Sequence, residues 1–296
     1  MISSRFREEV KFYLFILPWI IGFLSFFIIP ATAALIYSFT DYNAIQAPNW
    51  VGLQNFNTMF HDPIFTKSLT NTLFFVFVGV PVNVIFQIAV ANLLNLNVKG
   101  IAFFRTFYYL PYLVPVIATV VIWRLIFATD TGIVNAVLSW FGVEKIAWLE
   151  EPSLIKPMIV TMGMWASGSG VIVFLAALKG VPQHLYDAIK VDGAGMIRTF
   201  FVITLPMISP AILFSLVMQM ISSFQMFTEA FLLNQGGPDY ASTTFMLNTY
   251  NTAFRDFHFG LAMAKSWILF LFILIITLVI MGTSRRWVYY EGEERR

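Results

Sequence analysis

The residues best placed for a specific chemical contact lie in one short charged segment, residues 182–206, between two strongly apolar runs. Pro182 suits the opening of a helix, where a missing N–H costs nothing, so residues 183–191 favour a helix of roughly two to three turns. Gly193 suits the left-handed position that stops such a helix. One face carries residues spaced i, i+3, i+4 and i+7, namely Leu185, Ala188, Ile189 and Asp192. This largely apolar ridge with polar flanks indicates a helix that enters a groove on another protein or rests on lipid headgroups.

Enzymatic and metal chemistry find few suitable residues in the sequence. There is no cysteine, which excludes disulfides, thiolate metal sites and a cysteine nucleophile. The three histidines, His61, His184 and His258, lie far apart without the spacing of metal ligands. No phosphate-binding loop of the form Gly-x4-Gly-Lys-Ser/Thr occurs, and a net charge of +2 gives no argument for nucleic acid. We therefore expect no catalytic residue, no metal and no cofactor in this chain, and no enzymatic activity.

The elements that carry the charged segment must be membrane helices. The chain is 58% hydrophobic and only 11% charged, with a mean hydropathy of +0.77, and a soluble domain cannot bury that much apolar surface. Six apolar runs are long enough to cross a bilayer as helices: residues 12–39, 69–94, 108–127, 154–178, 203–224 and 263–283. Pro206 and Pro210 should bend the fifth run. The first run is too long for a signal-peptide core, although Ala31-Thr32-Ala33 imitates a cleavage site, so we expect it to remain as an anchor.

The positions of lysine and arginine set the expected orientation. Twelve of the 18 fall in the two terminal tails and in the second and fourth loops, which share one side if there are six spans. That side should be cytoplasmic, with both termini and the charged segment on it. None of the runs has an acidic residue at its middle, which argues against a proton-driven carrier. Arg124, Lys156 and Lys265 lie near the ends of runs and should be interfacial.

The charged segment resembles the Glu-Ala-Ala loop of ATP-binding cassette (ABC) importer permeases. Asp187-Ala188-Ile189 stands where that family usually has Glu-Ala-Ala, and both Asp192-Gly193-Ala194 and Leu205-Pro206 match the family closely. Further motifs are similar to the subgroup that imports carbohydrates and glycerol phosphate, and the likeness covers nearly the whole chain. These motifs lie at residues 50–56, 71–73, 103–106, 109–111, 174–178, 224–225, 236–238 and 287–291.

The resemblance implies an all-α polytopic membrane protein with six transmembrane helices, the type I ABC importer permease fold and a cytoplasmic coupling helix. It implies three regions: an N-terminal tail with the first helix and first external loop (1–68), a type-1 transmembrane domain (69–284) and a cytoplasmic tail (285–296). It also implies a bacterial or archaeal cytoplasmic membrane. The implied partners are a second, homologous permease that forms a heterodimer, two ATP-binding subunits that hold ATP and Mg, and an extracytoplasmic solute-binding protein. The residues implied in contact with the ATPase are Leu185, Tyr186, Asp187, Ala188, Val191, Asp192, Gly193 and Ala194.

The implied function is that of a membrane-spanning subunit of an ATP-driven importer, which moves a mono- or oligosaccharide by alternating access. A neutral sugar needs polar groups matched to its hydroxyls and flat aromatic faces. The fourth and fifth runs each offer such a face: Trp165 and Ser169 at i, i+4, and Gln219, Ser222 and Ser223 at i, i+3, i+4. The same residue types hold membrane helices together, so packing is the alternative for each of them. The alternative functions are import of glycerol phosphate or another solute, and ion-coupled secondary transport.

Overall fold

The computed structural model describes residues 4–290, with side chains from residue 11 onward. Arg295 and Arg296, which the orientation argument includes, and Glu291 of the last family motif lie outside the described residues. Within that range every regular element is a helix, apart from one isolated bridge between Thr40 and Trp50. The chain divides into two compact units, Met1–Asp62 with Thr249–Ile268 and Pro63–Asn248 with Leu269–Arg296. Each unit is described by itself below.

Three helices are long and apolar enough to cross a membrane: Lys11–Tyr37, Pro63–Leu94 and Phe259–Ser284. Three bent pairs pass the same test if each pair is one span: Ile101–Leu113 with Val116–Ile126, Ile155–Trp165 with Gly168–Lys179, and Met196–Met207 with Ser209–Phe224. The structure therefore agrees with six hydrophobic segments, but three of the predicted runs are not continuous helices. The bends measure 98°, 52° and 66° respectively.

The first unit contains the N-terminal helices and two pieces of longer C-terminal helices. Its elements are α1 (Ser4–Phe23), the π-helical turn η1 (Leu24–Ile28), α2 (Ile29–Tyr37), α3 (Gln54–His61), the end of α16 (Phe245–Phe254) and the start of α17 (Phe259–Ser284). None of the apolar window within Lys11–Tyr37 is buried inside the protein, which is typical of a helix covered by lipid. The loop after α2 is held by the Asn55 side chain, which donates to the carbonyl oxygens of Ser38 and Thr40 at 2.8 Å each.

Lys265 lies in the interior of the first unit. Its side chain is 2% exposed, and its ammonium group lies 3.6 Å from the Asp62 carboxylate and donates to the Thr252 hydroxyl at 2.9 Å. Lys265 is thus covered by protein and paired with a carboxylate, a feature that the expectation of an interfacial lysine does not include. Since a charge inside a membrane helix is costly without a partner, the ion pair explains how Lys265 is accommodated in α17.

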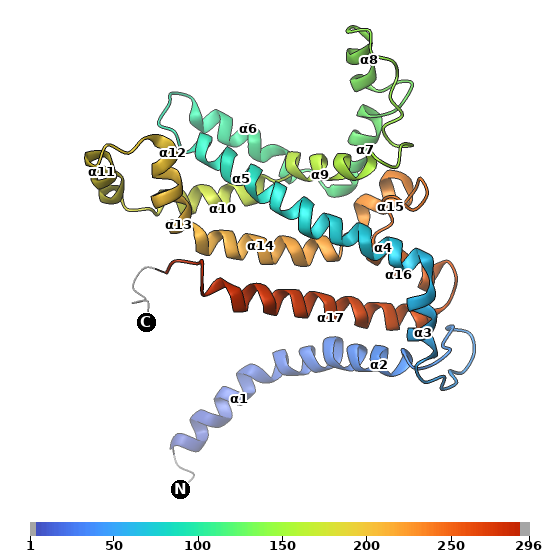
Figure 1. Ribbon diagram of the computed structural model, residues 1–296. Coiled ribbons are helices and arrows are strands. Elements are labelled where there is room, and N and C mark those ends of the chain that lie inside the picture. Colours follow the sequence, from blue (N-terminus) through green and yellow to red (C-terminus); the bar gives the residue numbers. More distant parts are fainter. Residues whose placement is uncertain (1–3, 291–296) are drawn as a thin grey trace. The chain divides into compact units, whose positions relative to one another are not determined.

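The second unit is a bundle built around α5 (Val80–Leu94), which packs against α10 (Gly168–Lys179) and α14 (Ser209–Phe224) (Figure 1). Its remaining helices are α4 (Pro63–Phe74), α6 (Ile101–Leu113), α7 (Val116–Ile126), α8 (Ile133–Ser139), α9 (Ile155–Trp165), α11 (Gln183–Val191), α12 (Met196–Thr199), α13 (Leu205–Met207), α15 (Thr228–Asn234), the start of α16 and the rest of α17. An apolar core joins α5, α10 and the start of α14, and includes Ile88, Leu94, Phe174, Leu178 and Ile208.

Proline positions explain where the long helices loosen. The π-helical turns η1, η2 (Phe75–Gly79) and η3 (Phe200–Thr204) each end two residues before a proline, at Pro30, Pro81 and Pro206. Because proline has no N–H to donate, the regular hydrogen-bond ladder is interrupted there, and a wider turn absorbs the defect. The predicted bend near Pro206 and Pro210 is confirmed, since α13 and α14 meet at the 66° break.

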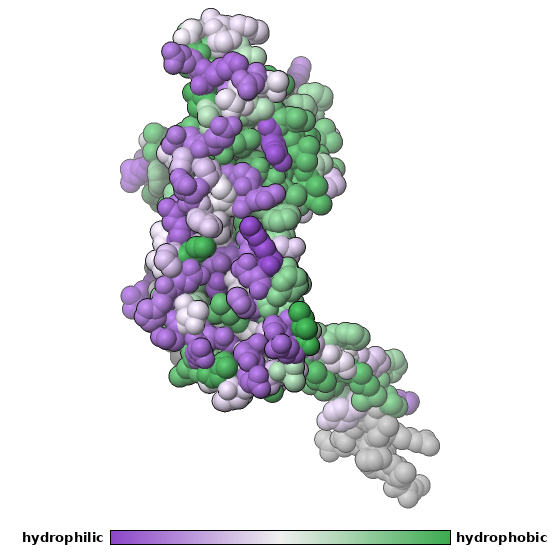
Figure 2. All heavy atoms as spheres, turned by 90° about the vertical axis from the view of Figure 1, so that its right-hand side faces the viewer, coloured by the Kyte–Doolittle hydropathy of each residue, from purple (hydrophilic) through white to green (hydrophobic). Residues whose placement is uncertain are grey.

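The third run departs most from the prediction. The chain is extended at Val114 and Pro115, so the expected span 108–127 is split into α6 and α7, which meet at 98°. With its 13 residues, α6 is about 20 Å long, shorter than the roughly 30 Å hydrocarbon core. Figure 1 shows α7 and α8 leaving the bundle at this corner. In the view toward the end that carries α8 and α15, hydrophilic side chains gather over the left and centre and hydrophobic ones mainly over the right, as expected of loops in water beside helices in lipid (Figure 2).

Candidate functional site

The predicted docking helix is present with the predicted bounds, as α11 (Gln183–Val191). Gly193 has a φ of +73°, which confirms the left-handed stop. The N–H of Gly193 donates to the Lys190 carbonyl at 3.0 Å, and the N–H of Ala194 donates to the Ile189 carbonyl at 3.2 Å. This pair of bonds is the Schellman arrangement, which satisfies carbonyl groups at a helix end and fixes the direction of the chain beyond it.

Two members of the predicted apolar ridge of α11, Leu185 and Ile189, face the protein's own bundle, whereas Ala188 and Asp192 are exposed. Ile189 is 9% exposed, and Leu185 and Tyr186 pack half-buried against the core of α5 and α10. The Tyr186 hydroxyl lies 3.2 Å from the Thr204 hydroxyl of η3. Two of the residues predicted to contact the ATPase, Leu185 and Tyr186, therefore pack α11 against the bundle.

The opposite face of α11 is open. His184, Asp187, Ala188 and Val191 are spaced i, i+3, i+4 and i+7 and are all exposed, Val191 to 88%. Asp187 accepts a hydrogen bond from the Gln183 side chain at 3.2 Å. Of the rest of the predicted set, Asp192 and Gly193 are exposed and Ala194 is half-buried. We call His184, Asp187, Ala188 and Val191 the outer face of α11.

A cavity of about 920 Å³ lies within the second unit. Four of the five residues predicted to contact a solute line it: Ser169, Gln219, Ser222 and Ser223. Trp165 is not among the described lining residues and packs edge-on against Trp123, with ring centroids 6.2 Å apart. The cause is the 52° break between α9 and α10, which separates Trp165 from Ser169 and removes their common helical face.

The cavity lining holds an amide pair of which the sequence analysis predicted only Gln219 and missed Gln87. Gln87 of α5 donates to the Gln219 side-chain oxygen at 3.3 Å, and Gln219 of α14 donates back to the Gln87 oxygen at 3.0 Å. Gln87 is only 4% exposed. A Cβ at Gly170 of α10 would collide with the Gln87 amide, so this glycine makes room for it. The available signal was the i, i+4 spacing of Asn83 and Gln87 within the second apolar run, which puts two amides on one helical face.

Two further polar groups of the lining are unusual. Thr119 is 2% exposed, and its hydroxyl has no hydrogen-bond partner among the described residues. Such groups are uncommon inside proteins and suit a ligand that brings its own hydroxyl groups. Glu229, on α15 beside the cavity, has its pKa raised above the ordinary value by burial, although a backbone N–H bond partly opposes that shift.

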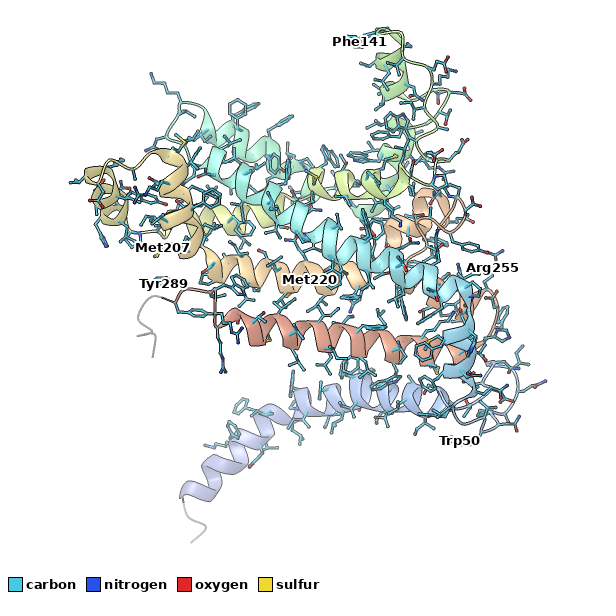
Figure 3. The ribbon with its side chains drawn as sticks, in the orientation of Figure 1. Trp50, Phe141, Met207, Met220, Arg255 and Tyr289 are labelled. Atoms are coloured by element: carbon cyan, nitrogen blue, oxygen red, sulfur yellow. The ribbon has the colours of Figure 1, made fainter. Side chains whose placement is uncertain are left out.

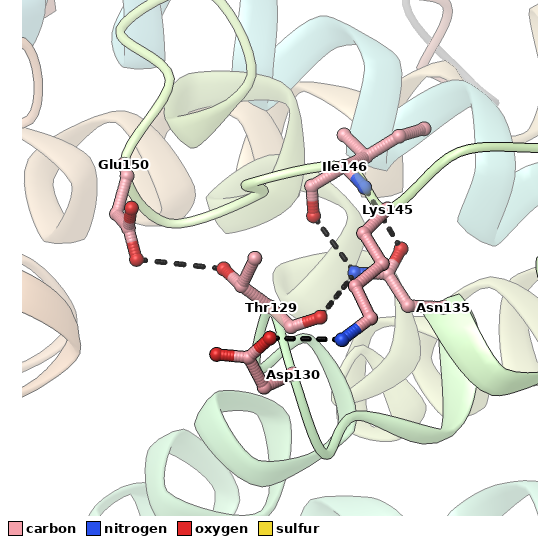
Figure 4. Close-up of polar contacts among 6 residues, drawn as sticks. All are labelled: Thr129, Asp130, Asn135, Lys145, Ile146 and Glu150. Carbon is pink, nitrogen blue, oxygen red and sulfur yellow. Dashed lines mark hydrogen bonds and ion pairs between the residues drawn. The ribbon is translucent and has the colours of Figure 1, made fainter.

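The loop between α7 and α9 is a folded structure (Figure 4). The Asn135 side chain donates to the carbonyls of Thr129 at 2.9 Å and Ile146 at 2.8 Å, and it accepts from the Trp148 indole N–H at 2.9 Å. Lys145 and Asp130 form an exposed ion pair at 2.9 Å. Because Asn135 satisfies backbone groups on both sides of the loop, α8 is held in place by hydrogen bonds.

The C-terminal tail returns to the end of the bundle that carries α11. Figure 3 shows Tyr289 beside Met207 there, with Met220 midway along α14. The Tyr289 N–H donates to the Ser209 hydroxyl at 2.8 Å, and Val288 is 6% exposed. The tail is therefore attached at the bend between α13 and α14.

Comparison with known proteins places these features in a family context. The family model described as binding-protein-dependent transport system inner membrane component matches residues 84–289. The probable ABC transporter permease protein YesP of Bacillus subtilis is 40% identical over 293 residues, which cover 97% of this chain and 94% of YesP. The diacetylchitobiose uptake system permease protein NgcF of Streptomyces coelicolor is 32% identical over 93% of this chain and 82% of NgcF. A chain of a bacterial alginate ABC transporter, solved with an alginate pentasaccharide-bound periplasmic protein, has a TM-score of 0.85 at 25% identity over 96% of each chain.

Proposed function

Because this chain belongs to the family of inner membrane components of binding-protein-dependent transport systems, we propose that it is the permease subunit of a sugar importer driven by a separate ATPase. One observation carries the proposal. The helices α10 and α14 both line the cavity, and they are also the helices that lead into and out of the segment carrying α11. A movement of α11 is therefore transmitted directly to the cavity walls.

The outer face of α11 is the surface proposed to meet the ATPase. His184, Asp187, Ala188 and Val191 offer a small apolar and polar patch that is exposed among the described residues. Asp192, Gly193 and Ala194 complete the contact at the Schellman turn. Leu185 and Tyr186 transmit the force inward because they are packed on the core. ATP and Mg then belong to the two partner ATPase subunits.

The lining of the cavity supports a sugar as the cargo. It combines hydroxyl and amide groups with the exposed rings of Tyr112 and Phe214, which can cover the C–H faces of a sugar. The described lining includes the acidic Glu229 but no lysine or arginine, which fits a neutral cargo better than glycerol phosphate. A relative is described as a diacetylchitobiose permease, and the structural relative was solved with an alginate-bound partner, so we propose a mono- or oligosaccharide.

The same proposal covers the assembly and its placement. A second permease would pair with this chain, and an extracytoplasmic binding protein would deliver the sugar, in a bacterial or archaeal cytoplasmic membrane with both termini in the cytoplasm. Residues 69–284 would form the transport domain between the 1–68 region and the tail at 285–296. ATP closure of the ATPase pair moves α11, and the cavity changes the side of the membrane to which it opens.

A reconstituted complex tests this function. The cysteine-free chain allows a single Ala188→Cys label on the outer face of α11, with Phe104→Cys, exposed on α6, as the control. We expect ATP-dependent sugar uptake into proteoliposomes and a cross-link from Ala188→Cys, but not from the control, to the ATPase. Uptake that needs no ATP and stops with an ionophore would instead establish an ion-coupled carrier.

A further inference from the structure

The cavity has a recognisable floor, and Gln87 lies on it. The residues of α5 that line the cavity include Val80, Asn83 and Gln87, and Gln87 is the last of them toward Leu94. Beyond it, Ile88, Ala91 and Leu94 belong to the apolar core that closes the end of the bundle carrying α11. A polar solute in the cavity therefore meets Gln87 and its partner Gln219 near the α11 end of the lining, where Ser215 of α14 lies one turn further toward that end.

Three helices meet at this amide pair. Gln87 belongs to α5 and Gln219 to α14, and their two hydrogen bonds, at 3.3 and 3.0 Å, run in opposite directions. The backbone of α10 lies directly against the Gln87 amide, because a Cβ at Gly170 would collide with it. The amide pair therefore links α5 and α14 by hydrogen bonds at the point where α10 packs against them.

We propose that Gln87 is a further cargo-contacting residue and that the Gln87–Gln219 amide pair is the contact that a sugar breaks on reaching the cavity floor. A sugar hydroxyl both donates and accepts hydrogen bonds, so it can replace either half of the amide pair. The replacement costs little, because each amide exchanges one neutral hydrogen bond for another. Breaking the amide pair frees α14 to move relative to α5 and α10.

This inference rests on the proposed sugar-import function and deepens it. It explains how cargo binding in the cavity acts on the segment that carries α11, since α10 leads into that segment and α14 follows it. A ligand shifts a conformational equilibrium only by the difference in its affinity for the two states. The amide pair supplies that difference in affinity. In the state with the pair formed, a sugar must displace the Gln87–Gln219 hydrogen bonds, whereas in the state with the pair separated it binds to amides that are already open.

The test uses the complete complex in proteoliposomes and the double variant Gln87→Leu with Gln219→Leu. Replacing both partners by apolar groups of similar size leaves no unpaired amide, so the complex should assemble with wild-type thermal stability. We expect its ATPase rate without sugar to rise about threefold to tenfold, which is the effect of losing one net hydrogen bond. Stimulation by sugar-loaded binding protein should fall toward unity, and the sugar concentration for half-maximal uptake should rise.

Two further variants, one at the amide pair and one control on the same helix, separate loss of the pair from failure to assemble. Gln219→Asn keeps the polarity but is too short to reach Gln87, so it should raise the sugar-free ATPase rate even if the double variant fails to assemble. Asn92→Leu removes an exposed amide on the same helix, outside the cavity, and should leave both rates unchanged. The proposal is overturned if the double variant or Gln219→Asn keeps the wild-type sugar-free rate, whether or not uptake weakens. A wild-type complex without sugar-stimulated hydrolysis would instead remove the proposed function itself.

Discussion

The hydroxyl of Tyr186 lies 3.2 Å from the hydroxyl of Thr204, so the helix α11 is bonded to the π-helical turn η3 that follows it in the chain. Thr204 is 5% exposed, and Tyr186 packs half-buried against the bundle core. Tyr186 and Thr204 lie near the two ends of the charged segment 182–206, and their bond joins these ends. We expect this bond to make α11 move as one body with the bundle.

Removing either hydroxyl should weaken the mechanical coupling between α11 and the bundle. We expect Tyr186→Phe and Thr204→Val each to lower the number of sugars imported per ATP hydrolysed, because a neutral hydrogen bond contributes about 0.5–1.5 kcal/mol. The measurement is uptake and hydrolysis on the same proteoliposomes. The double variant is the control: a direct bond requires its effect to be smaller than the sum of the two single effects. Strict additivity would show that the two hydroxyls act separately.

At Gly193 a substitution introduces backbone strain without a steric collision, so the effect of strain can be measured alone. Its φ is +73°, and a Cβ built there meets no atom within 4 Å in the part of the chain that the structure describes. Gly193→Ala should therefore cost about 1–2 kcal/mol of backbone strain, distort the Schellman turn and uncouple ATP hydrolysis from uptake. Gly193→Asp should uncouple further, while the complex still assembles.

The neighbouring glycine supplies the control for that prediction. Gly195 also has open space around it, but its φ of −72° suits any residue. Gly195→Ala should leave uptake per ATP at the wild-type value. Equal effects of the alanine substitutions at 193 and 195 would contradict the left-handed turn as the cause.

Much of the fold could be predicted because its signals are local. The bounds of α11 follow from Pro182, the helix-favouring run and Gly193, and the six apolar runs follow from hydropathy alone. The family match and the structural relative confirm the predicted all-α importer permease fold. The place of Ser169, Gln219, Ser222 and Ser223 in the cavity lining could be predicted because polar residues inside apolar helices mark faces turned away from lipid, whereas their contact with a solute stays a prediction.

The remaining features depend on contacts between distant parts of the chain. The covered face of α11 is decided by η3 and the bundle core, which periodicity does not include. Gln87 pairs with a residue 132 positions away, and the loss of Trp165 from the cavity follows from a break that no proline marks. The ion pair of Lys265 with Asp62 joins residues about 200 positions apart in the chain, and the position of Lys265 near a helix end gives no sign of it.

That ion pair predicts unequal effects of removing its two partners. Asp62→Asn should destabilise the protein by about 3 kcal/mol, because it removes the carboxylate that lies 3.6 Å from the buried Lys265 charge. Lys265→Met should cost less, since the Asp62 side chain is 29% exposed and can be hydrated. Thermal unfolding in detergent measures both variants. Lys11→Met, at an exposed position of α1, is the control and should change little; a larger loss from Lys265→Met would contradict the argument.

Glu229 predicts a dependence of stability on pH. Burial raises the pKa of this carboxyl group above its ordinary value of 4.5, so the folded protein binds a proton more tightly there than the unfolded chain does. The contribution of Glu229 to stability is therefore present at low pH and is lost as the pH rises from about 4.5 through the raised folded pKa. Glu229→Gln cannot ionise and should remove this loss, so its melting temperature should fall less than that of the wild type across the window. Glu151→Gln, in an exposed loop, should retain the wild-type profile. Parallel pH profiles for Glu229→Gln and the wild type would show that Glu229 is well hydrated and does not face a low-dielectric cavity.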